Sequence, residues 1–232
     1  MRIDVLTLFP ELFPGPLGES IMGRAAERKL VEFGTVNIRD FAQDARGTVD
    51  DKPYGGGPGM LMMAEPVVSA IESVKRDGSL VILTSPRGRV FNQKLAHELA
   101  KKEHLVIVTG HYEGVDERAI ELAVDMEISL GDFVLTSGVL PAMTIADTVV
   151  RLLPGVLGDD ASSVDESHSG SLLEYPQYTR PTEFRGLRVP EILMSGDHGR
   201  IASYRQSERE KLTRIRRPDM WENFMSQTEK EV

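Results

Sequence analysis

A segment rich in glycine and proline, Thr48–Met63 (TVDDKPYGGGPGMLMM), combines residue types that could hold a ligand. Glycine lets another molecule approach the backbone closely, and proline stiffens a segment that would otherwise be flexible. Asp50, Asp51 and Lys52 add charge where the segment begins. It is not a Walker A phosphate loop, because no Gly-Lys-Ser/Thr follows the glycines. These residues alone fit a ligand-holding loop and a tight structural turn equally well.

Two further places carry side chains suited to proton transfer or charge stabilisation. Asp165 and Glu166 lie in a polar stretch beside Ser167 and His168. A carboxylate there could act as a base, although solvated loop acids are the commoner explanation of such a pair. Arg151 interrupts the apolar helical run TVVRLLPGVLG, so its side chain must pair with an anion or extend to solvent.

The elements that would position these residues follow from the apolar patterns. Short, mostly apolar runs predict strands over Arg2–Leu8, Ser79–Thr84, Leu105–Thr109 and Met126–Ser129. Helical spacing predicts helices over Ser20–Leu30, Asn92–Glu103 (with Asn92 as the cap), Asp116–Val124 and Met143–Leu153. Strands that alternate with helices and are apolar throughout indicate an α/β fold around a parallel sheet.

Ligands of parallel α/β sheets bind beyond the carboxyl ends of the strands. The segments in that position are Ser85–Gly88, Gly110–Gly114 and Leu130–Gly138. Glycine in each of them would allow close backbone approach to a flat, polar-edged group such as adenosine, although each alone is more often a turn. None is a dinucleotide fingerprint, since the Gly-x-Gly-x-x-Gly spacing is absent, and this argues against an oxidoreductase of that type.

Composition narrows the class of protein. The 232 residues are 41% hydrophobic and 27% charged, which excludes a wholly disordered chain. The chain has no cysteine, so disulfides and zinc-thiolate sites are excluded. The five histidines form no helical ligand pair, and we assign no structural metal. Neither a signal peptide nor an apolar run long enough to span a membrane is visible, and we expect a soluble, cytoplasmic protein.

The chain divides by composition into three parts. Residues 1–153 form the predicted α/β domain, and residues 154–190 are polar and rich in Ser, Asp, Glu and Pro, as expected of a linker or lid. Residues 191–232 form a predicted helical domain. Within it, Arg205–Arg217 carries six basic residues against two acids, whereas the whole chain has a net charge of −9. A basic stripe on an acidic protein can dock phosphates at one defined place, although a solvated helix face is the commoner explanation.

Six motifs in this order resemble one bacterial family over nearly the whole chain. They are Thr48–Met63, GHYEGVDER (110–118), LGDFVLTSG (130–138), LPAMT (140–144), PGVLG (154–158) and LLEYPQYTRP (172–181). Together they resemble the tRNA (guanine-N(1))-methyltransferases of the SPOUT class. The resemblance implies a methyl transfer from S-adenosylmethionine to guanosine just 3′ of the tRNA anticodon, which maintains the reading frame.

The resemblance also implies a fold and a set of cofactor-binding residues. The α/β sheet should contain a deep trefoil knot, followed by a small helical C-terminal domain. The protein should be a homodimer with its active sites at the subunit interface. S-adenosylmethionine should bind bent in the knot, with its adenine on backbone amides and Glu113 near its methionine end. The matching positions are Thr84, Ser85, Pro86, Gly110, Glu113, Leu130, Gly131, Asp132, Phe133, Val134, Leu135, Ser137, Gly138 and Leu140.

The family's catalytic arginine matches Arg151, and its catalytic aspartate matches Glu166. Asp165 is adjacent, so both acids are candidates for the base, and position favours Glu166. A second departure from the family pattern is Thr136-Ser137-Gly138-Val139, where the family has an acid in place of Val139. A glutamate base with an ordinary pKa of about 4.3 is weak at neutral pH, so a cation should stabilise the charge that develops on the guanine 6-oxygen. Arg151 is the candidate for that stabilisation.

The resemblance further implies tRNA contacts from Arg205–Arg217 and from Arg39–Asp51, a lid that orders when tRNA binds, and a divalent ion, with Mg²⁺ expected. The sequence has no dedicated site for that ion. Two alternatives stay open at this point. One is a SPOUT methyltransferase that acts on another RNA target, and the other is an RNA-binding protein that has lost catalysis.

Overall fold

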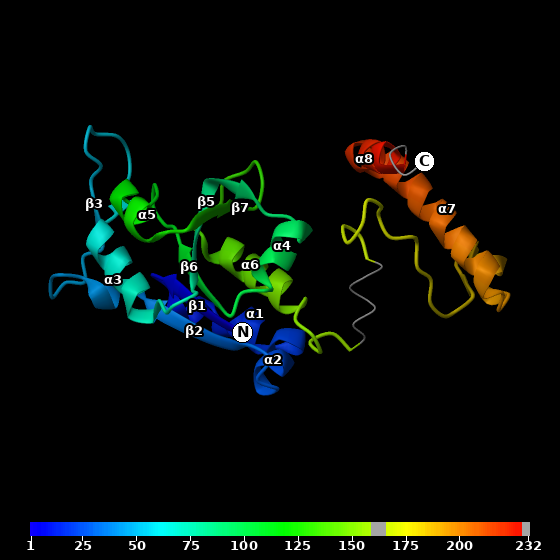
Figure 1. Ribbon diagram of the computed structural model, residues 1–232, viewed down its shortest axis with the longest axis horizontal. Coiled ribbons are helices and arrows are strands. Elements are labelled where there is room, and N and C mark those ends of the chain that lie inside the picture. The colour runs from blue at the N-terminus through cyan, green and yellow to red at the C-terminus, as the bar shows by residue number, and fades with distance from the viewer. Residues whose placement is uncertain (159–165, 229–232) are drawn as a thin grey trace. The chain divides into compact units, whose positions relative to one another are not determined.

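The computed structural model of the chain describes residues 1–158 and 166–228. These residues fall into two compact units, unit 1 before and unit 2 after a division at residue 160. Unit 1 is built on a five-stranded parallel sheet with the order β2-β1-β6-β5-β7 (Figure 1). The strands are β1 (Arg2–Thr7), β2 (Glu32–Asn37), β5 (Leu80–Val90), β6 (His104–Thr109) and β7 (Met126–Ser129). The predicted parallel α/β sheet is therefore confirmed.

Helices cover both faces of this sheet (Figure 1). One face packs against α1 (Pro14–Gly18), α2 (Ser20–Glu27), α4 (Gln93–Leu99) and α6 (Val139–Val150). The other face packs against α3 (Ala64–Val74) and α5 (Glu117–Ala123). Because side chains alternate along a strand, Ile3 and Val5 of β1 enter the first core, while Leu6 enters the second. Burial on both faces explains why these strands are apolar throughout.

The predicted helices are found, with different ends. Asn92 caps α4 as expected, since its side chain accepts a hydrogen bond from the Leu95 amide at 2.9 Å. Helix α6 begins at Val139 rather than at Met143, because Pro141 lies in the first turn, where a proline is tolerated. Strand β2 and helix α3 were not predicted. Gly34 in β2 and Pro66 in α3 obscure the patterns of these two elements.

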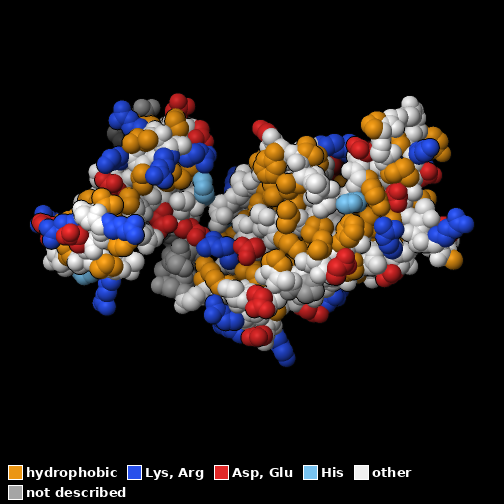
Figure 2. Space-filling view, turned by 180° about the vertical axis from the view of Figure 1, so that it is seen from behind, with side chains coloured by type: hydrophobic (Ala, Val, Ile, Leu, Met, Phe, Trp, Pro, Cys, Tyr) orange, Lys and Arg blue, Asp and Glu red, His pale blue; other side chains and the backbone are white. Residues whose placement is uncertain are grey.

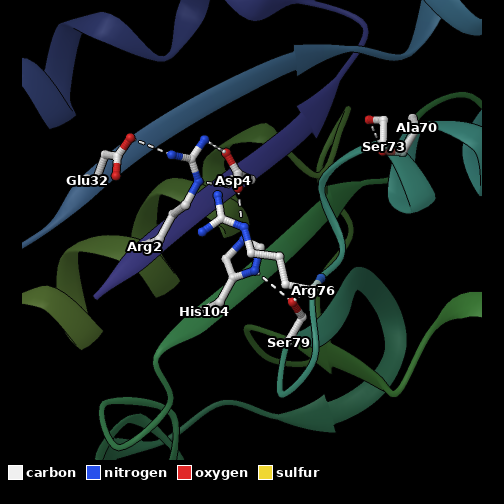
Figure 3. Close-up of polar contacts among 8 residues, drawn as sticks. All are labelled: Arg2, Asp4, Glu32, Ala70, Ser73, Arg76, Ser79 and His104. Atoms are coloured by element: carbon white, nitrogen blue, oxygen red, sulfur yellow. Dashed lines mark hydrogen bonds and ion pairs between the residues drawn. The ribbon is translucent and has the colours of Figure 1, made fainter.

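The amino-terminal end of the sheet carries a buried polar network (Figure 3). Asp4 and His104 are 1% and 5% exposed, and His104 Nε2 lies 2.8 Å from an Asp4 carboxylate oxygen. Arg2 also binds Asp4, at 2.7 Å, and it pairs with Glu32 on β2. Burial alone would raise the pKa of Asp4, but hydrogen bonds and charges from Arg2 and His104 hold it below the ordinary 3.8. The network joins β1, β2 and β6 at the end of the sheet opposite the strand-end segments.

Unit 2 is built around two helices, α7 (His198–Arg216) and α8 (Pro218–Thr228). A hairpin of β8 (Glu183–Phe184) and β9 (Leu187–Arg188) precedes them, within the stretch 154–190 that composition marks as a linker. The chain before the hairpin packs along α7. The Leu173 amide donates to Thr213 Oγ1 at 2.8 Å, and the guanidinium of Arg205 lies 4.6 Å from the centre of the Tyr175 ring.

Candidate active site

A cavity of about 510 Å³ opens in unit 1 at the carboxyl ends of β6 and β7 and beside Leu83–Arg87 of β5, a strand that continues to Val90 and does not end at Thr84 as predicted. Its walls come from the three strand-end segments that the sequence singles out, together with strand residues and Leu61. The volume lies within the range of small-molecule sites, which is about 300–1,000 Å³. The carboxyl ends of parallel strands are thus the location of the main candidate site.

Most of the proposed cofactor-binding residues line this cavity. These are Thr84, Ser85, Pro86, Gly110, Glu113, Leu130, Phe133, Val134, Leu135, Ser137 and Gly138. Gly131, Asp132 and Leu140 belong to the same stretch of chain but are not among the lining residues. Sequence reasoning did not single out Arg87, His111, Tyr112 and Glu117, which also line it. The first three belong to strand-end segments that were already marked, so position alone could have suggested them.

Gly138 is the point where three segments of the cavity wall meet. Its amide donates to the Gly110 carbonyl at 2.7 Å, and Thr84 Oγ1 donates to the Gly138 carbonyl at 3.3 Å. A Cβ at position 138 would lie 2.0 Å from Thr84 Oγ1 and 2.7 Å from the Gly110 nitrogen. Only glycine fits there, because the start of α6 lies directly against Thr84 of β5 and the end of β6.

The glycine-rich segment packs against the cavity through Glu113. Gly59 has a φ of +75°, and a Cβ there would lie 2.4 Å from the Glu113 side chain. Backbone hydrogen bonds connect the same stretches, from the Glu113 amide to the Met60 carbonyl at 3.0 Å and from the Met62 amide to the Gly114 carbonyl at 2.9 Å. Leu61 is the residue of Thr48–Met63 that lines the cavity. The segment therefore supports the wall that carries Glu113.

An aromatic cluster borders the cavity beside Gly110. The His111 ring packs edge-on between Phe9 and Tyr112, with centroids 5.1 and 4.6 Å apart. Tyr112 has a φ of +57°, a conformation that L-residues seldom adopt and that is often found at functional sites. Arg39 Nη2 lies 3.5 Å from the Tyr112 hydroxyl. This contact connects the cluster to the Arg39–Asp51 stretch, the predicted anticodon-loop contact.

The chemistry of the wall suits a ligand with a flat ring and a positive charge. Phe133, Val134 and Leu135 are exposed apolar residues of the lining. Gly110 and Leu130 line the same cavity. Glu113 brings a carboxylate to the same cavity, whereas the carboxylate of Glu117, which also lines it, is paired with Arg87. Carboxylates attract an ammonium or sulfonium group, while the apolar side chains and nearby glycines accommodate a planar base. S-adenosylmethionine has all of these features, so the residues present fit it.

Arg151 caps the carboxyl end of α6, the helix whose N-cap is Gly138 in the cavity wall. Its amide donates to the Asp147 carbonyl at 3.1 Å, and its side chain is half-buried. It is not among the residues that line the cavity.

Glu166 lies in unit 2 and is half-buried. Its carbonyl accepts a hydrogen bond from the Ser169 amide at 3.3 Å, and Ser167 Oγ accepts one from the Glu174 amide at 2.9 Å. Asp165, the other candidate base, lies outside the described residues.

Some basic side chains of the Arg205–Arg217 stripe bind other residues of unit 2, and others are exposed to solvent. Arg209 donates to the Leu173 carbonyl at 3.2 Å, and Arg217 pairs with Asp219 at 2.6 Å. Lys211 also pairs with Glu208, at 3.6 Å, whereas Arg214 and Arg216 are exposed on α7. Figure 2 shows Lys and Arg side chains gathered on this unit. Part of the stripe thus stabilises the unit itself, and part is available to bind anions.

Residues 1–223 match the family model described as tRNA (Guanine-1)-methyltransferase TrmD. The chain belongs to this family. Three relatives, each named tRNA (guanine-N(1)-)-methyltransferase, extend the comparison. The one from Carboxydothermus hydrogenoformans is 54% identical over 220 residues, covering 95% of this chain and 87% of the relative. The one from Geobacter sp. (strain M21) is 56% identical over 222 residues, covering 95% of this chain and 89% of the relative. The one from Dictyoglomus turgidum is 53% identical over 222 residues, covering 96% of this chain and 90% of the relative.

In residues 1–158 and 166–228, no group of three His, Asp or Glu side chains could hold a metal ion. The Mg²⁺ implied by likeness to the TrmD family therefore finds no fitting ligand set in those residues. Within the same ranges, no helix is both long and apolar enough to cross a membrane.

Proposed function

We propose that the chain transfers a methyl group from S-adenosylmethionine to ring nitrogen 1 of the guanosine just 3′ of the tRNA anticodon. The observation that carries the proposal is the family match over residues 1–223. The cavity beside β5 and at the ends of β6 and β7 supports it, because that cavity has the size and the chemistry for the methyl donor. Since the substrate is tRNA, the proposed place of action is the cytoplasm.

In this proposal the cofactor binds in the cavity of unit 1. The fourteen positions given above hold it, with Gly131, Asp132 and Leu140 placed beside the eleven that line the wall. Glu113 lies near the positive methionine end. When bound, S-adenosylmethionine supplies an electrophilic methyl group on its sulfonium sulfur. The proposal also includes a trefoil knot in the sheet, which would need close packing of the kind seen where Gly138 meets Thr84 and Gly110.

The chain's own residues would handle the proton and the charge. Neutral guanine carries a proton on nitrogen 1, and this proton must leave as the nitrogen bonds to the methyl group. Glu166 is the proposed base that accepts it, with Asp165 as the neighbouring alternative. Arg151 is proposed to stabilise the negative charge that develops on the guanine 6-oxygen, which compensates for a weak carboxylate base.

Two further elements of the proposal concern the partners. The active protein is a homodimer in which the lid of one subunit carries Glu166 to the cofactor of the other. The exposed basic residues of α7 and the Arg39–Asp51 stretch contact the tRNA backbone and anticodon loop. The target base would be turned out of its stack to reach the cavity, as enzymes that act on bases generally require. The domain division of 1–153, 154–190 and 191–232 belongs to the same proposal.

Transfer of tritiated methyl groups to unmodified tRNA tests these roles. We expect wild type and Asp165→Asn to be active and Glu166→Gln to lose about a hundredfold or more in kcat. Arg151→Ala should lose about a hundredfold in kcat while it still binds S-adenosylmethionine. Loss in Asp165→Asn alone would move the base by one residue. Full turnover in Arg151→Ala would refute the stabilising role of that arginine.

A further inference from the structure

Strand β5 is interrupted at the cavity by extra residues. Thr84 and Arg89 both pair with Ile128 of β7, so the four residues Ser85–Gly88 project from the ladder. Insertions of this kind re-aim side chains and are common beside active sites. Ser85, Pro86 and Arg87 all line the cavity. The projecting segment, Ser85–Gly88, is therefore one wall of the candidate cofactor site.

Backbone packing fixes the base of the projecting segment. A Cβ on Gly88 would lie 2.4 Å from both the Glu127 carbonyl carbon and the Ile128 nitrogen. The strand thus returns to β7 in direct backbone contact, which only glycine permits. At the cavity end, the Ser85 hydroxyl accepts a hydrogen bond from the Arg87 amide at 3.3 Å. Side-chain contacts also join the segment to its neighbours.

One guanidinium makes those contacts in two directions. Arg87 Nη2 lies 2.8 Å from Glu117 Oε2 in the first turn of α5, and Arg87 Nε lies 3.4 Å from Glu127 Oε2 on β7. The hydrogen bond to Glu117 and the charge of Glu127 both raise the pKa of Arg87. Glu117 also lines the cavity, whereas Glu127 does not. The side chain thus connects the projecting segment to the helix and the strand on either side of it.

We propose that Arg87 is a positioning residue that holds Ser85 and Pro86 in place as a wall of the S-adenosylmethionine pocket. The inference rests on the proposed function, because the ligand is the methyl donor of that function. A lysine could not replace Arg87, since a single ammonium lacks the planar fork that reaches two carboxylates. Each pair is partly exposed, and exposed pairs contribute little to folding, so the effect belongs to ligand binding rather than to stability.

Arg89 provides a matched control on the same strand. It is an arginine of similar exposure, paired with Glu98 at 3.5 Å, but it does not line the cavity. We would measure S-adenosylmethionine binding to the full-length protein by titration calorimetry for wild type, Arg87→Ala and Arg89→Ala. Arg87→Ala should weaken binding by about fivefold, and Arg89→Ala should bind as wild type does. In turnover, the effect of Arg87→Ala should fall on KM for the cofactor more than on kcat.

A Glu127 variant distinguishes a positioning role of Arg87 from direct contact between Arg87 and the ligand. Since Glu127 does not line the cavity, loss of its carboxylate should affect ligand binding only through Arg87. Glu127→Gln should weaken binding by about twofold in the wild-type background and have no effect in the Arg87→Ala background. Thermal unfolding midpoints equal to that of wild type would show that all variants are folded.

Two results would overturn the inference while leaving the proposed function standing. One is equal cofactor affinity in Arg87→Ala and Arg89→Ala, and the other is a Glu127→Gln effect that persists unchanged without Arg87. Failure of the wild type to bind S-adenosylmethionine is a different result. It would contradict the proposed function itself, and the inference with it.

Discussion

At the scale of single residues, Gly138 shows how one missing side chain organises the site. The glycine allows α6 to start directly against Thr84 and Gly110, so that three strand-end segments share one cavity. The sequence places a glycine at this position, but the need for it arises from residues that lie 54 and 28 positions away along the chain. The same limit applies to Arg87, whose partners Glu117 and Glu127 are 30 and 40 residues distant. The spacing of residues in the sequence therefore places Gly138 and Arg87 near the site but does not reveal which residues they contact.

Gly138→Ala should therefore damage both stability and cofactor binding. The added methyl group would overlap Thr84 Oγ1 and the Gly110 nitrogen, so the free energy of unfolding should fall by about 3 kcal/mol. Urea unfolding of the purified protein measures this change. Gly158→Ala is the control, because nothing lies within 4 Å of a Cβ there. Equal stability of the two variants would show that the segments at Gly138 can separate without loss.

At the scale of elements, apolar runs identified four strands of the sheet, and capping identified α4. The edge strand β2 was missed because Gly34 and the exposed residues Glu32 and Thr35 interrupt its apolar run. Helix α3 was missed because Pro66 in its first turn reads in a sequence as a helix breaker, although Val67, Ala70 and Ile71 have helical spacing. Tertiary packing against β1 and β6 forms these elements, and a pattern read from one segment does not contain that information.

The buried network at the start of the sheet predicts a pH dependence of stability. The pKa of Asp4 is lower in the folded than in the unfolded chain, so its contribution is present above pH 3.8 and is lost as the pH falls further. Asp4→Asn should lower the free energy of unfolding by about 3 kcal/mol near neutral pH. Urea unfolding from pH 7 down into the acid range would show the difference from wild type shrink below pH 3.8. A difference that stays constant into acid would mean that Asp4 does not carry a stabilising charge.

At the scale of the whole molecule, the proposed catalytic groups belong to different units. Arg151 is part of unit 1, and Glu166 is part of unit 2. The polar composition of residues 154–190 predicted a linker or lid near this boundary. It did not predict the β8–β9 hairpin or the packing of Leu173 and Tyr175 on α7. These contacts are specific to the folded unit, whereas a polar composition indicates only that a stretch lacks its own apolar core.

If Glu166 acts on the partner subunit's cofactor, two inactive chains should complement each other. Coexpression of Arg151→Ala with Glu166→Gln produces mixed dimers in which one site has both defects and the other has none. With random pairing, we expect about one quarter of the wild-type rate of methyl transfer. Each variant alone serves as the control. Activity no higher than that of the single variants would place both groups in the same subunit.

The central claim is that this chain methylates nitrogen 1 of one guanosine in tRNA. The most direct measurement incubates the protein and labelled S-adenosylmethionine with an unmodified tRNA bearing guanosine 3′ of the anticodon, and with the same tRNA bearing adenosine there. The nucleosides are then separated by chromatography. We predict labelled 1-methylguanosine from the first tRNA and no label from the second. Label in another nucleoside, or none in either tRNA although the cofactor binds, would contradict the account.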